Sequence, residues 1–398
     1  MTQEPKPITP SNRLPLFYAV TALFWFALYV YVPFVAPFGE EMGANLRMLG
    51  LIGGAYGFTQ MVIRFPLGII SDRLGRRKIF VLLGLLFAAA SGFVVFFFPS
   101  PNMLLVSRAL GGVAASSWVT FIVLNSAYHP PGEATKSVGY LNGANAWGTM
   151  SALLLGGIIA HWVGVPYAFL LGGGAGLVAL ALGFGIREKR TAHTADASSA
   201  IHKKTPPPSV KELLGVAKNR FLLFAAMLAV LVQFVRFAST FGFTPLVAHG
   251  LGATPLQLGL LGVVAAAPGL VVSPLAGTVL PRVLGVRGTL AGGFVLSGVS
   301  VAVIPFTQHL WQLFVVQIVG SVGAIAAFTL LMGLCIRDIT PERRATAMGF
   351  FQAVYGLGMF LGPFVMGWLG HSISLEAAFV TAGAVGLLGA ALVFAQKY

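Results

Sequence analysis

Long apolar segments, separated by short polar connections, follow one another along almost the whole chain. Each segment runs for roughly 18 to 27 residues, which lets a tilted helix cross a hydrocarbon core of about 30 Å. We expect twelve membrane-spanning helices, at Leu14–Pro37, Leu46–Ser71, Ile79–Phe98, Asn102–Ala127, Ser137–Val163, Pro166–Ile186, Phe221–Ala248, Pro255–Val279, Gly288–Phe306, Leu310–Ile336, Ala345–Gly370 and Leu375–Ala395. The pattern therefore predicts an all-α membrane protein in which short loops join successive helices.

The composition excludes a protein that folds in water. Of the 398 residues, 57% are hydrophobic and only 9% are charged, whereas soluble domains carry about 25% charged residues. The first twelve residues are polar and include three prolines, unlike a cleavable signal peptide. We therefore expect the first span to act as the targeting segment of a multi-pass protein of the plasma (inner) membrane, surrounded by the lipid bilayer.

The positive charge is distributed as in a membrane protein. A formal net charge of +14 could suggest nucleic-acid binding, yet the cations lie in short connections rather than on one soluble surface. With a cytoplasmic N-terminus, 21 of the 25 Lys and Arg residues fall on the cytoplasmic side, and outside the spans only Arg47 falls on the other. This asymmetry predicts that both termini are cytoplasmic, and we expect no nucleic acid as a partner.

A polar segment divides the chain into two halves that are internal repeats. Residues 187–219 contain small polar residues and three consecutive prolines, a composition typical of a linker. We expect one six-helix bundle in residues 1–186, a cytoplasmic linker in 187–219 and a second six-helix bundle in 220–398. Matches at offsets of 209 or 210 residues include Gly50 with Gly259, Gly139 with Gly349, Asn142 with Gln352, and Gly157 with Gly367. The repeats predict two pseudo-symmetric bundles related by an axis along the membrane normal.

A compact charged turn joins the second and third spans. From Gly68 onward its sequence follows the pattern G-x-x-x-D-R-x-G-R-R. Gly68 would let a neighbouring helix approach closely, and Gly75 can take a positive φ and turn the chain. Asp72, at a helix end, could pair with Arg73 or Arg76, or face the positive N-terminus of another helix.

This loop resembles the signature loop between helices 2 and 3 of the major facilitator superfamily of secondary transporters, and the chain is similar to bacterial drug and solute efflux members. The resemblance covers nearly the whole chain and implies two six-helix bundles that work by alternating access. It also implies a gating role for Gly68, Asp72, Arg73, Gly75 and Arg76. A plain cytoplasmic anchor is the alternative interpretation of the basic residues.

Two further motifs resemble those of the family. Arg108 begins a sequence in span 4 that is similar to the R-x-x-q-G-x-g-a-a motif, which is linked to proton coupling; an Arg tied to backbone carbonyls is the alternative. The residues Gly358, Gly362, Pro363 and Gly367 in span 11 are similar to the antiporter motif, which in the family lies in span 5. Because the motif is displaced, a generic helix bend and packing face is the alternative.

None of the eleven acidic residues lies well inside a span, whereas three arginines do. The absence of an embedded carboxylate disfavours selectivity for organic cations. Arg64 shares a helical face with Tyr56 and Gln60, two turns and one turn earlier; because it is near the cytoplasmic end of its span, snorkelling is the alternative. Arg236 lies near the middle of span 7 with Gln233 one turn away, so it cannot easily reach the aqueous interface. We expect Arg236 above all to contact a ligand or take part in coupling.

Other polar and aromatic residues lie on spans that line the central cavity in the family, or on spans 5 and 11. We expect substrate or coupling contacts from Trp25, Tyr29, Trp118, Gln233, Gln317, Asn142, Asn145, Gln352 and Tyr355. For a single aromatic residue, helix packing or the interfacial belt is the alternative. As a set, these side chains suit a mixed amphipathic solute.

The sequence lacks the signals of an enzyme or a primary pump. The seven histidines fall in loops or near span ends without metal-ligand spacing, Cys335 is the only cysteine, and no nucleotide-binding Gly-Lys-Ser/Thr loop occurs. We therefore expect no metal and no cofactor.

Secondary active transport of a small organic solute is the function that we expect, most simply proton-coupled efflux by a monomer. One alternative is transport of an anionic solute that uses the embedded arginines. An alternative of another class is a non-transporting membrane sensor or partner subunit, and an intramembrane enzyme fits least well.

Overall fold

The computed structural model describes residues 14–129, 134–188, 219–337, 339 and 344–395, and all regular elements within them are helical. The first half contains α1 Leu14–Tyr29, the 3₁₀ turn η1 Val32–Phe34, α2 Val35–Glu41, α3 Leu46–Leu74, α4 Arg77–Phe97, α5 Pro101–Ser116, α6 Trp118–Ser126, α7 Ala134–Trp162 and α8 Val165–Gly183. The second half contains α10 Arg220–Ala238, the π-helical turn η2 Ser239–Phe243, α11 Thr244–Gly250, α12 Pro255–Ala266, α13 Gly269–Thr278, α14 Leu280–Val283, α15 Gly285–Val303, η3 Ile304–Phe306, α16 Leu310–Leu334, α17 Arg344–Ser372 and α18 Leu375–Ala395.

These helices confirm the predicted all-α membrane fold. Within the described residues, eleven helical segments are long and apolar enough to cross a membrane. The remaining expected span is α3, a continuous helix of 29 residues whose hydropathy is lowered by several glycines and by Arg64 and Asp72. Most of the linker predicted at 187–219 lies outside the described residues, so the predicted domain boundaries stay predictions.

Local sequence signals explain where several helices begin and end. The side chains of Asn45 and Ser100 accept hydrogen bonds from backbone N–H groups in the first turns of α3 and α5. Thr254, the repeat equivalent of Asn45, forms a reciprocal capping box with Gln257 at the start of α12. Gly75 ends α3 with φ of 59°, a conformation that glycine adopts without steric cost. Caps of this kind satisfy backbone groups that a helix end leaves unpaired.

Four expected spans are interrupted, which the apolar pattern did not predict. Span 1 breaks between α1 and α2, and span 7 breaks at η2, its repeat-equivalent position. Span 4 breaks at Ser117, and span 8 breaks near Pro268. Interruptions that expose backbone groups inside a membrane are tolerated where they are buried in protein or line a cavity.

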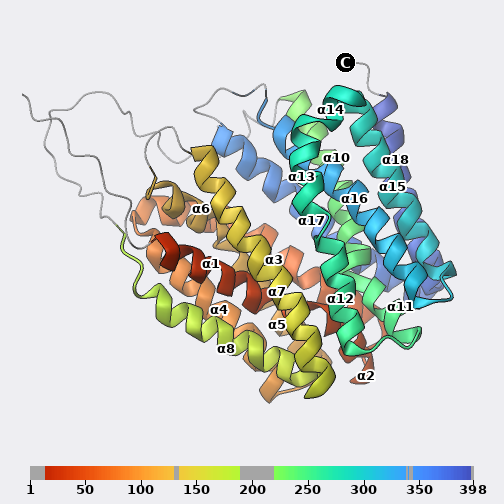
Figure 1. Cartoon of the computed structure of the whole chain (residues 1–398), viewed down its shortest axis with the longest axis horizontal. Helices are drawn as coiled ribbons and strands as arrows, with labels where there is room; N and C mark the ends of the chain where they lie inside the picture. The colour runs from red at the N-terminus through yellow and green to blue at the C-terminus, as the bar shows by residue number, and fades with distance from the viewer. Residues whose placement is uncertain (1–13, 130–133, 189–218, 338, 340–343, 396–398) are drawn as a thin grey trace, which may run out of the picture.

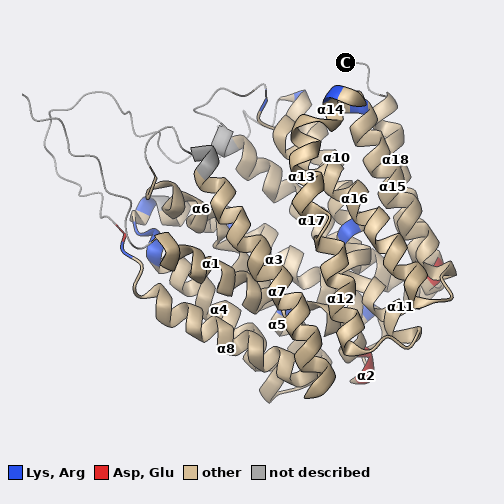
Figure 2. Ribbon diagram, viewed as in Figure 1, with Lys and Arg blue, Asp and Glu red and all other residues tan. Residues whose placement is uncertain are grey.

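The two halves pack in the same way, as the repeats predict. In the first half α1 packs on α7, α4 on α8 and α5, and α3 on α5; in the second half α10 packs on α17, α15 on α18 and α16, and α13 on α16. Figure 1 shows the two groups of helices side by side, meeting around α2, α11 and α12. Basic residues gather mainly at one end of the helices, and only a few lie midway along them (Figure 2).

The halves meet through two equivalent helix crossings, α3 on α17 and α7 on α12. At the first crossing, a Cβ built on Gly50 would stand 2.9 Å from the Gly367 Cα. At the second, a Cβ on Gly259 would stand 2.7 Å from the Gly157 Cα. These four glycines, which are two repeat-related pairs, let the helix backbones touch.

The crossings lie toward one end of the bundle. There, Glu41 Oε1 is 3.7 Å from His249 Nε2, and Arg47 Nη2 donates to Ser372 Oγ at 3.4 Å. We call this end the closed face, defined by Glu41, Arg47, His249 and Ser372, and the other end the basic face, defined by Arg77, Lys78, Arg287 and Arg337. Nearer the basic face, a Cβ added at Gly68 on α3, Gly139 on α7, Gly277 on α13 or Gly349 on α17 would meet no described atom within 4 Å. The halves are therefore joined at the closed face and apart toward the basic face.

Candidate functional site

Three arginines that the sequence places inside spans converge at the interface between the halves. Arg64 on α3 and Arg108 on α5 are 7% and 4% exposed, and Arg236 near the end of α10 is partly buried. Charged side chains inside a membrane protein face protein or water because lipid does not solvate them. Their partners decide what this site can bind.

Arg64 bridges the two halves. Its Nη1 donates to Gln352 Oε1 at 3.1 Å and to the Tyr355 hydroxyl at 3.3 Å, both on α17. Its Nη2 donates to the backbone oxygen of Ala115 on α5 at 3.4 Å. The burial of this guanidinium argues against the snorkelling that its place in α3 would permit.

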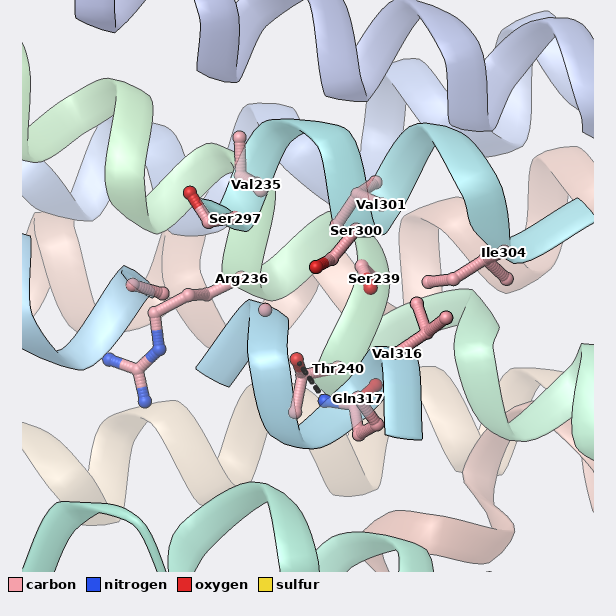
Figure 3. Close-up of a pocket in the computed structure, with 12 residues that line it drawn as sticks. Val235, Arg236, Ser239, Thr240, Ser297, Ser300, Val301, Ile304, Val316 and Gln317 are labelled. Carbon is pink, nitrogen blue, oxygen red and sulfur yellow. Dashed lines mark hydrogen bonds between the residues drawn. The ribbon is translucent and has the colours of Figure 1, made fainter. Parts of the chain in front are cut away.

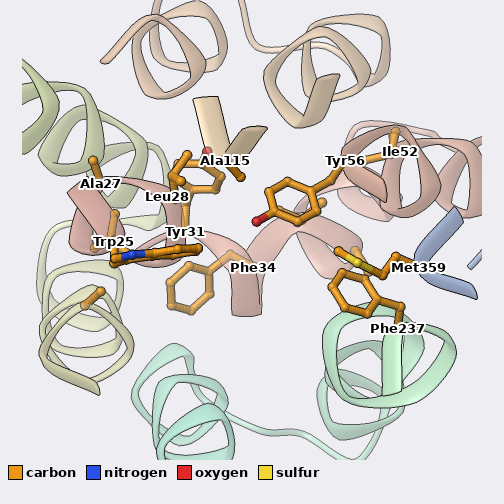
Figure 4. Packing of buried hydrophobic residues seen from close by; sticks show 14 of the residues in the cluster. Trp25, Ala27, Leu28, Tyr31, Phe34, Ile52, Tyr56, Ala115, Phe237 and Met359 are labelled. Carbon is orange, nitrogen blue, oxygen red and sulfur yellow. The ribbon is translucent and has the colours of Figure 1, made fainter. Parts of the chain in front are cut away.

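Arg108 lies over an aromatic face. Its guanidinium carbon is 4.6 Å from the centre of the Tyr56 ring, a cation–π arrangement. The Tyr56 ring in turn stacks on Phe237 of the other half, with 6.1 Å between ring centres. Figure 4 shows the Tyr56 hydroxyl pointing toward the side chains of α1, with Phe237 and Met359 on the other side of the ring.

Arg236 also uses aromatic faces and an amide. Its Nη1 donates to Gln233 Oε1 at 3.2 Å, and its guanidinium lies 5.5 Å from the Phe241 ring centre and 5.9 Å from that of Phe328. The side chains of Tyr29 and Tyr355 are close neighbours of this guanidinium. Tyr29 is also a neighbour of Arg108 and Tyr56.

These residues form one site, which we call the arginine cluster. It comprises Arg64, Arg108, Arg236, Tyr29, Tyr56, Gln233, Gln352 and Tyr355, together with Gln60, which is buried beside Tyr56. The carboxylates whose side chains the structure describes belong to Glu40, Glu41, Glu188 and Glu376, at helix ends or in a connection. The described partners of the three guanidinium groups are therefore neutral, so the site keeps a net positive charge in a region of low dielectric constant.

Trp25 and Trp118 lie beside the cluster in the first half. Their rings meet edge to face with 5.2 Å between ring centres, and Trp25 also packs 5.8 Å from Tyr29. Tyr29 meets Phe241 of the second half at 5.9 Å. Trp25 is thus one side chain away from the interface between the halves.

Gln317 lines a cavity within the second half, and Arg236 is the one residue of the cluster that also lines it. The cavity has a volume of about 20 Å³, enough for one water molecule. Gln317 Nε2 donates to Thr240 Oγ1 at 2.8 Å, and in Figure 3 the Arg236 guanidinium points away from this pair. At the equivalent place in the first half, the Tyr31 ring fills the space and its hydroxyl lies 2.9 Å from Ser91 Oγ.

Two predicted residues on α7 stand apart from the cluster. Asn142 is exposed, and Asn145 Oδ1 accepts a hydrogen bond from Thr149 Oγ1 at 3.1 Å within its own helix. The described contacts of the three arginines include neither residue. Their roles as substrate contacts stay predictions.

The signature loop is described except for one side chain. Arg73 and Arg76 are exposed, and Gly75 closes α3 through its N–H bond to the Ser71 oxygen. The side chain of Asp72 lies outside the part that the structure describes, so its expected partner is untested.

A different acid caps the helix that follows this loop. The carboxylate of Glu188 accepts from the backbone N–H groups of Arg77 at 2.6 Å and Lys78 at 3.0 Å, at the start of α4. A carboxylate stabilises a helix N-terminus in this position.

The span 11 motif is a packing face toward two helices. A Cβ on Gly358 or Gly362 would collide with backbone atoms of α10, and a Cβ on Gly367 would collide with α3. Pro363 packs on the same part of α3, where its Cβ would stand 2.9 Å from a Cβ on Gly53. This geometry agrees with the packing alternative and leaves a role in antiport untested.

Sequence reasoning missed several residues of the site. The sequence placed Tyr56 on the helical face of Gln60 and Arg64 but did not predict it as a contact of the site. Phe241 and Phe328 gave no signal, because apolar spans contain many phenylalanines and only tertiary packing brings these two to Arg236.

Comparison with known proteins identifies the family. A family model described as Major Facilitator Superfamily matches residues 17–249 and 226–397. The Quinolone resistance protein NorA of Staphylococcus aureus is 21% identical over 367 residues, which cover 92% of this chain and 92% of that protein. An uncharacterized transporter of the same type from Methanocaldococcus jannaschii is 24% identical over 356 residues, covering 86% of this chain and 87% of that one.

A solved structure has the same fold. A bacterial homolog of the human lysosomal transporter Spinster, in an inward-facing and unoccupied conformation, superposes with a TM-score of 0.79 at 17% identity. The superposition covers 98% of this chain and 97% of the other.

Proposed function

The chain belongs to the major facilitator superfamily, and on that premise we propose that it carries an organic solute with an anionic group across the plasma membrane by alternating access. That it is a membrane transporter of a small molecule rather than an enzyme follows from the family. The anionic character of the solute is our own inference. One observation carries it: three arginines meet at the interface between the halves, and their described partners are neutral.

The energetics favour an anion at this site. An arginine at the centre of a transmembrane helix is unfavourable by about 2.5–3.5 kcal/mol on insertion scales. Amide, hydroxyl and aromatic groups offset part of this cost but leave the charge in place. An oxyanion between Arg236 and the other two arginines would neutralise part of this charge and could form paired hydrogen bonds to a guanidinium.

The arrangement of the halves supports alternating access. If the basic face is cytoplasmic, as the distribution of Lys and Arg predicts, the closed face is external and the site opens toward the cytoplasm. In the opposite state, the signature loop around Asp72 would close the cytoplasmic side. Both termini are then cytoplasmic.

Export is the direction that we propose, with protons exchanged and a monomer as the working unit. The name of the Quinolone resistance protein NorA supports export. Proton exchange rests on the resemblance of the span 4 motif at Arg108. A carboxylate inside a span, a common proton carrier, is absent from the sequence.

Binding by Arg236 variants tests the anion proposal. The probes are hexanoate, hexylammonium and hexanol, which differ mainly in charge. Cys335 is buried, so a maleimide dye should label it mainly after unfolding. We expect hexanoate to raise the unfolding temperature of the wild-type protein more than the other two probes do.

The variants then separate binding from folding. Arg236→Gln should fold but lose the shift with hexanoate, and Arg236→Lys should weaken binding by about tenfold because an ammonium lacks the planar fork of donors. A stable Arg236→Gln protein that binds hexanoate like the wild type would refute the anionic site.

A further inference from the structure

Two buried donors beside the arginine cluster lack acceptors. Trp25 Nε1 and Arg64 Nε are both inaccessible, and neither has a hydrogen-bond partner among the described residues. Both side chains are 7% exposed. Buried donors are almost always paired, because leaving one unpaired forfeits the hydrogen bond that water would supply. Two such donors beside a positively charged site point to a missing acceptor.

The two donors lie against one turn of the chain. Arg64 donates through Nη2 to the Ala115 oxygen in the last turn of α5. Trp25 meets the ring of Trp118, one turn later and just past the break at Ser117. The guanidinium of Arg64 and the indole of Trp25, which come from two different helices, therefore contact residues on either side of the break between α5 and α6.

The surroundings of these donors are aromatic. Trp25 contacts Phe24 at 5.5 Å, Trp118 at 5.2 Å and Tyr29 at 5.8 Å between ring centres. Across the interface, Arg236 lies near the rings of Phe241 and Phe328. Rings on both sides suit a flat aromatic body, which can meet their edges and faces.

We infer that the solute is an aromatic oxyanion whose charged oxygens accept hydrogen bonds from Trp25 Nε1 and Arg64 Nε. This inference rests on the proposed function, since it names the class of anion held at the same site. Trp25 is a specificity-determining residue: its N–H selects an acceptor, and its ring, with those of Tyr29 and Trp118, selects an aromatic body.

The test compares three probes on the purified full-length protein: 2-naphthoate, hexanoate and 2-naphthylmethanol. We expect 2-naphthoate to bind about tenfold or more tightly than hexanoate, which has the charge without the rings, and than 2-naphthylmethanol, which has the rings without the charge. Trp25→Phe keeps an aromatic ring and removes the N–H, so it should weaken 2-naphthoate binding by about tenfold or more. Trp147→Phe is the control, because Trp147 is 77% exposed and should bind like the wild type.

A second measurement does not depend on the folding of a variant. In wild-type protein with ¹⁵N-labelled tryptophan, the indole N–H signal of Trp25, one of six, should move when 2-naphthoate is added. A stationary signal, together with unchanged binding by Trp25→Phe, would mean that an ordered water pairs this N–H and would overturn the inference. Equal binding of hexanoate and 2-naphthoate would also overturn it.

These outcomes differ from failure of the proposed function. If 2-naphthoate and hexanoate bind equally and Arg236→Gln abolishes both, the aromatic class is wrong and the anionic site stands. If 2-naphthylmethanol binds as tightly as 2-naphthoate and Arg236→Gln changes neither, the anionic site itself is wrong. Binding of none of the three probes would count against both.

Discussion

Two kinds of contact offset the unfavourable burial of the three embedded arginines, namely hydrogen bonds and aromatic faces. Arg64 donates to amide, hydroxyl and backbone oxygens, whereas Arg108 lies over the ring of Tyr56. Arg236 combines an amide with two aromatic faces. None of these partners carries a negative charge, so they position each guanidinium without neutralising it. Under the proposed function, such a site could bind an anion and release it in each cycle.

At the residue scale, the charged residues of the site were easier to predict than the side chains that pack around them. A guanidinium inside an apolar span stands out in a sequence, and the structure brings all three together with the predicted Tyr29, Gln60, Gln233, Gln352 and Tyr355. Gln317 could not be separated from this group, because its orientation depends on the cavity beside Thr240. Glu188 was missed because the helix that it caps, α4, starts 111 residues earlier in the chain.

Glu188 provides a test of this local account. Glu188→Gln should lower the free energy of unfolding by about 0.5–2 kcal/mol, because the neutral amide caps the N-terminus of α4 less well than a carboxylate. Thermal unfolding followed through Cys335 labelling measures the change. Glu40→Gln, an exposed site at the closed face, is the matched control, and equal stability of the two variants would refute the cap.

At the scale of elements, the positions of the spans followed from the sequence but their interruptions did not. Apolar length sets where a helix crosses the membrane, and the observed bounds differ from the expected ones by a few residues. The break between α1 and α2 and the π-helical turn η2 occupy equivalent places in the repeats. Such breaks depend on packing between helices and carry little composition signal, although a π-helical turn often marks a functional site.

The glycine crossings predict a gate. Gly367→Val should push α17 away from α3, because a side chain at this position would collide with the Leu46 oxygen and the Gly50 backbone. The closed face should then open. Spin labels at Glu40 and Gly250, in a Cys335→Ala background, should report a longer distance across this face.

Gly349→Val is the matched control for the gate. It lies on the same helix, and a Cβ there would meet no described atom within 4 Å. We expect its distance distribution to equal that of the parent protein. An unchanged distribution in a folded Gly367→Val protein would show that the crossing does not hold the closed face.

At the scale of the whole molecule, the repeats predict two halves of similar structure, and the site depends on places where the two halves differ. One hydrophobic core runs through the first half and continues into the second half near the closed face. A second core lies within the second half. In the first half, the Tyr31 side chain fills the space that is equivalent to the cavity beside Thr240 and Gln317 in the second half. Repeats in the sequence revealed the shared architecture, but which differences matter depends on side-chain volumes that only the folded molecule compares.

Counterflow across a lipid bilayer tests most directly whether the arginine cluster carries an organic anion. Proteoliposomes are loaded with unlabelled 2-naphthalenesulfonate, whose permanent charge slows leakage through lipid, and are then diluted into a trace of the labelled compound. We expect transient accumulation of label with the wild-type protein, and none with Arg236→Gln or with protein-free liposomes. Accumulation by Arg236→Gln equal to that of the wild type, or counterflow of a permanent organic cation in place of the anion, would contradict transport through this cluster.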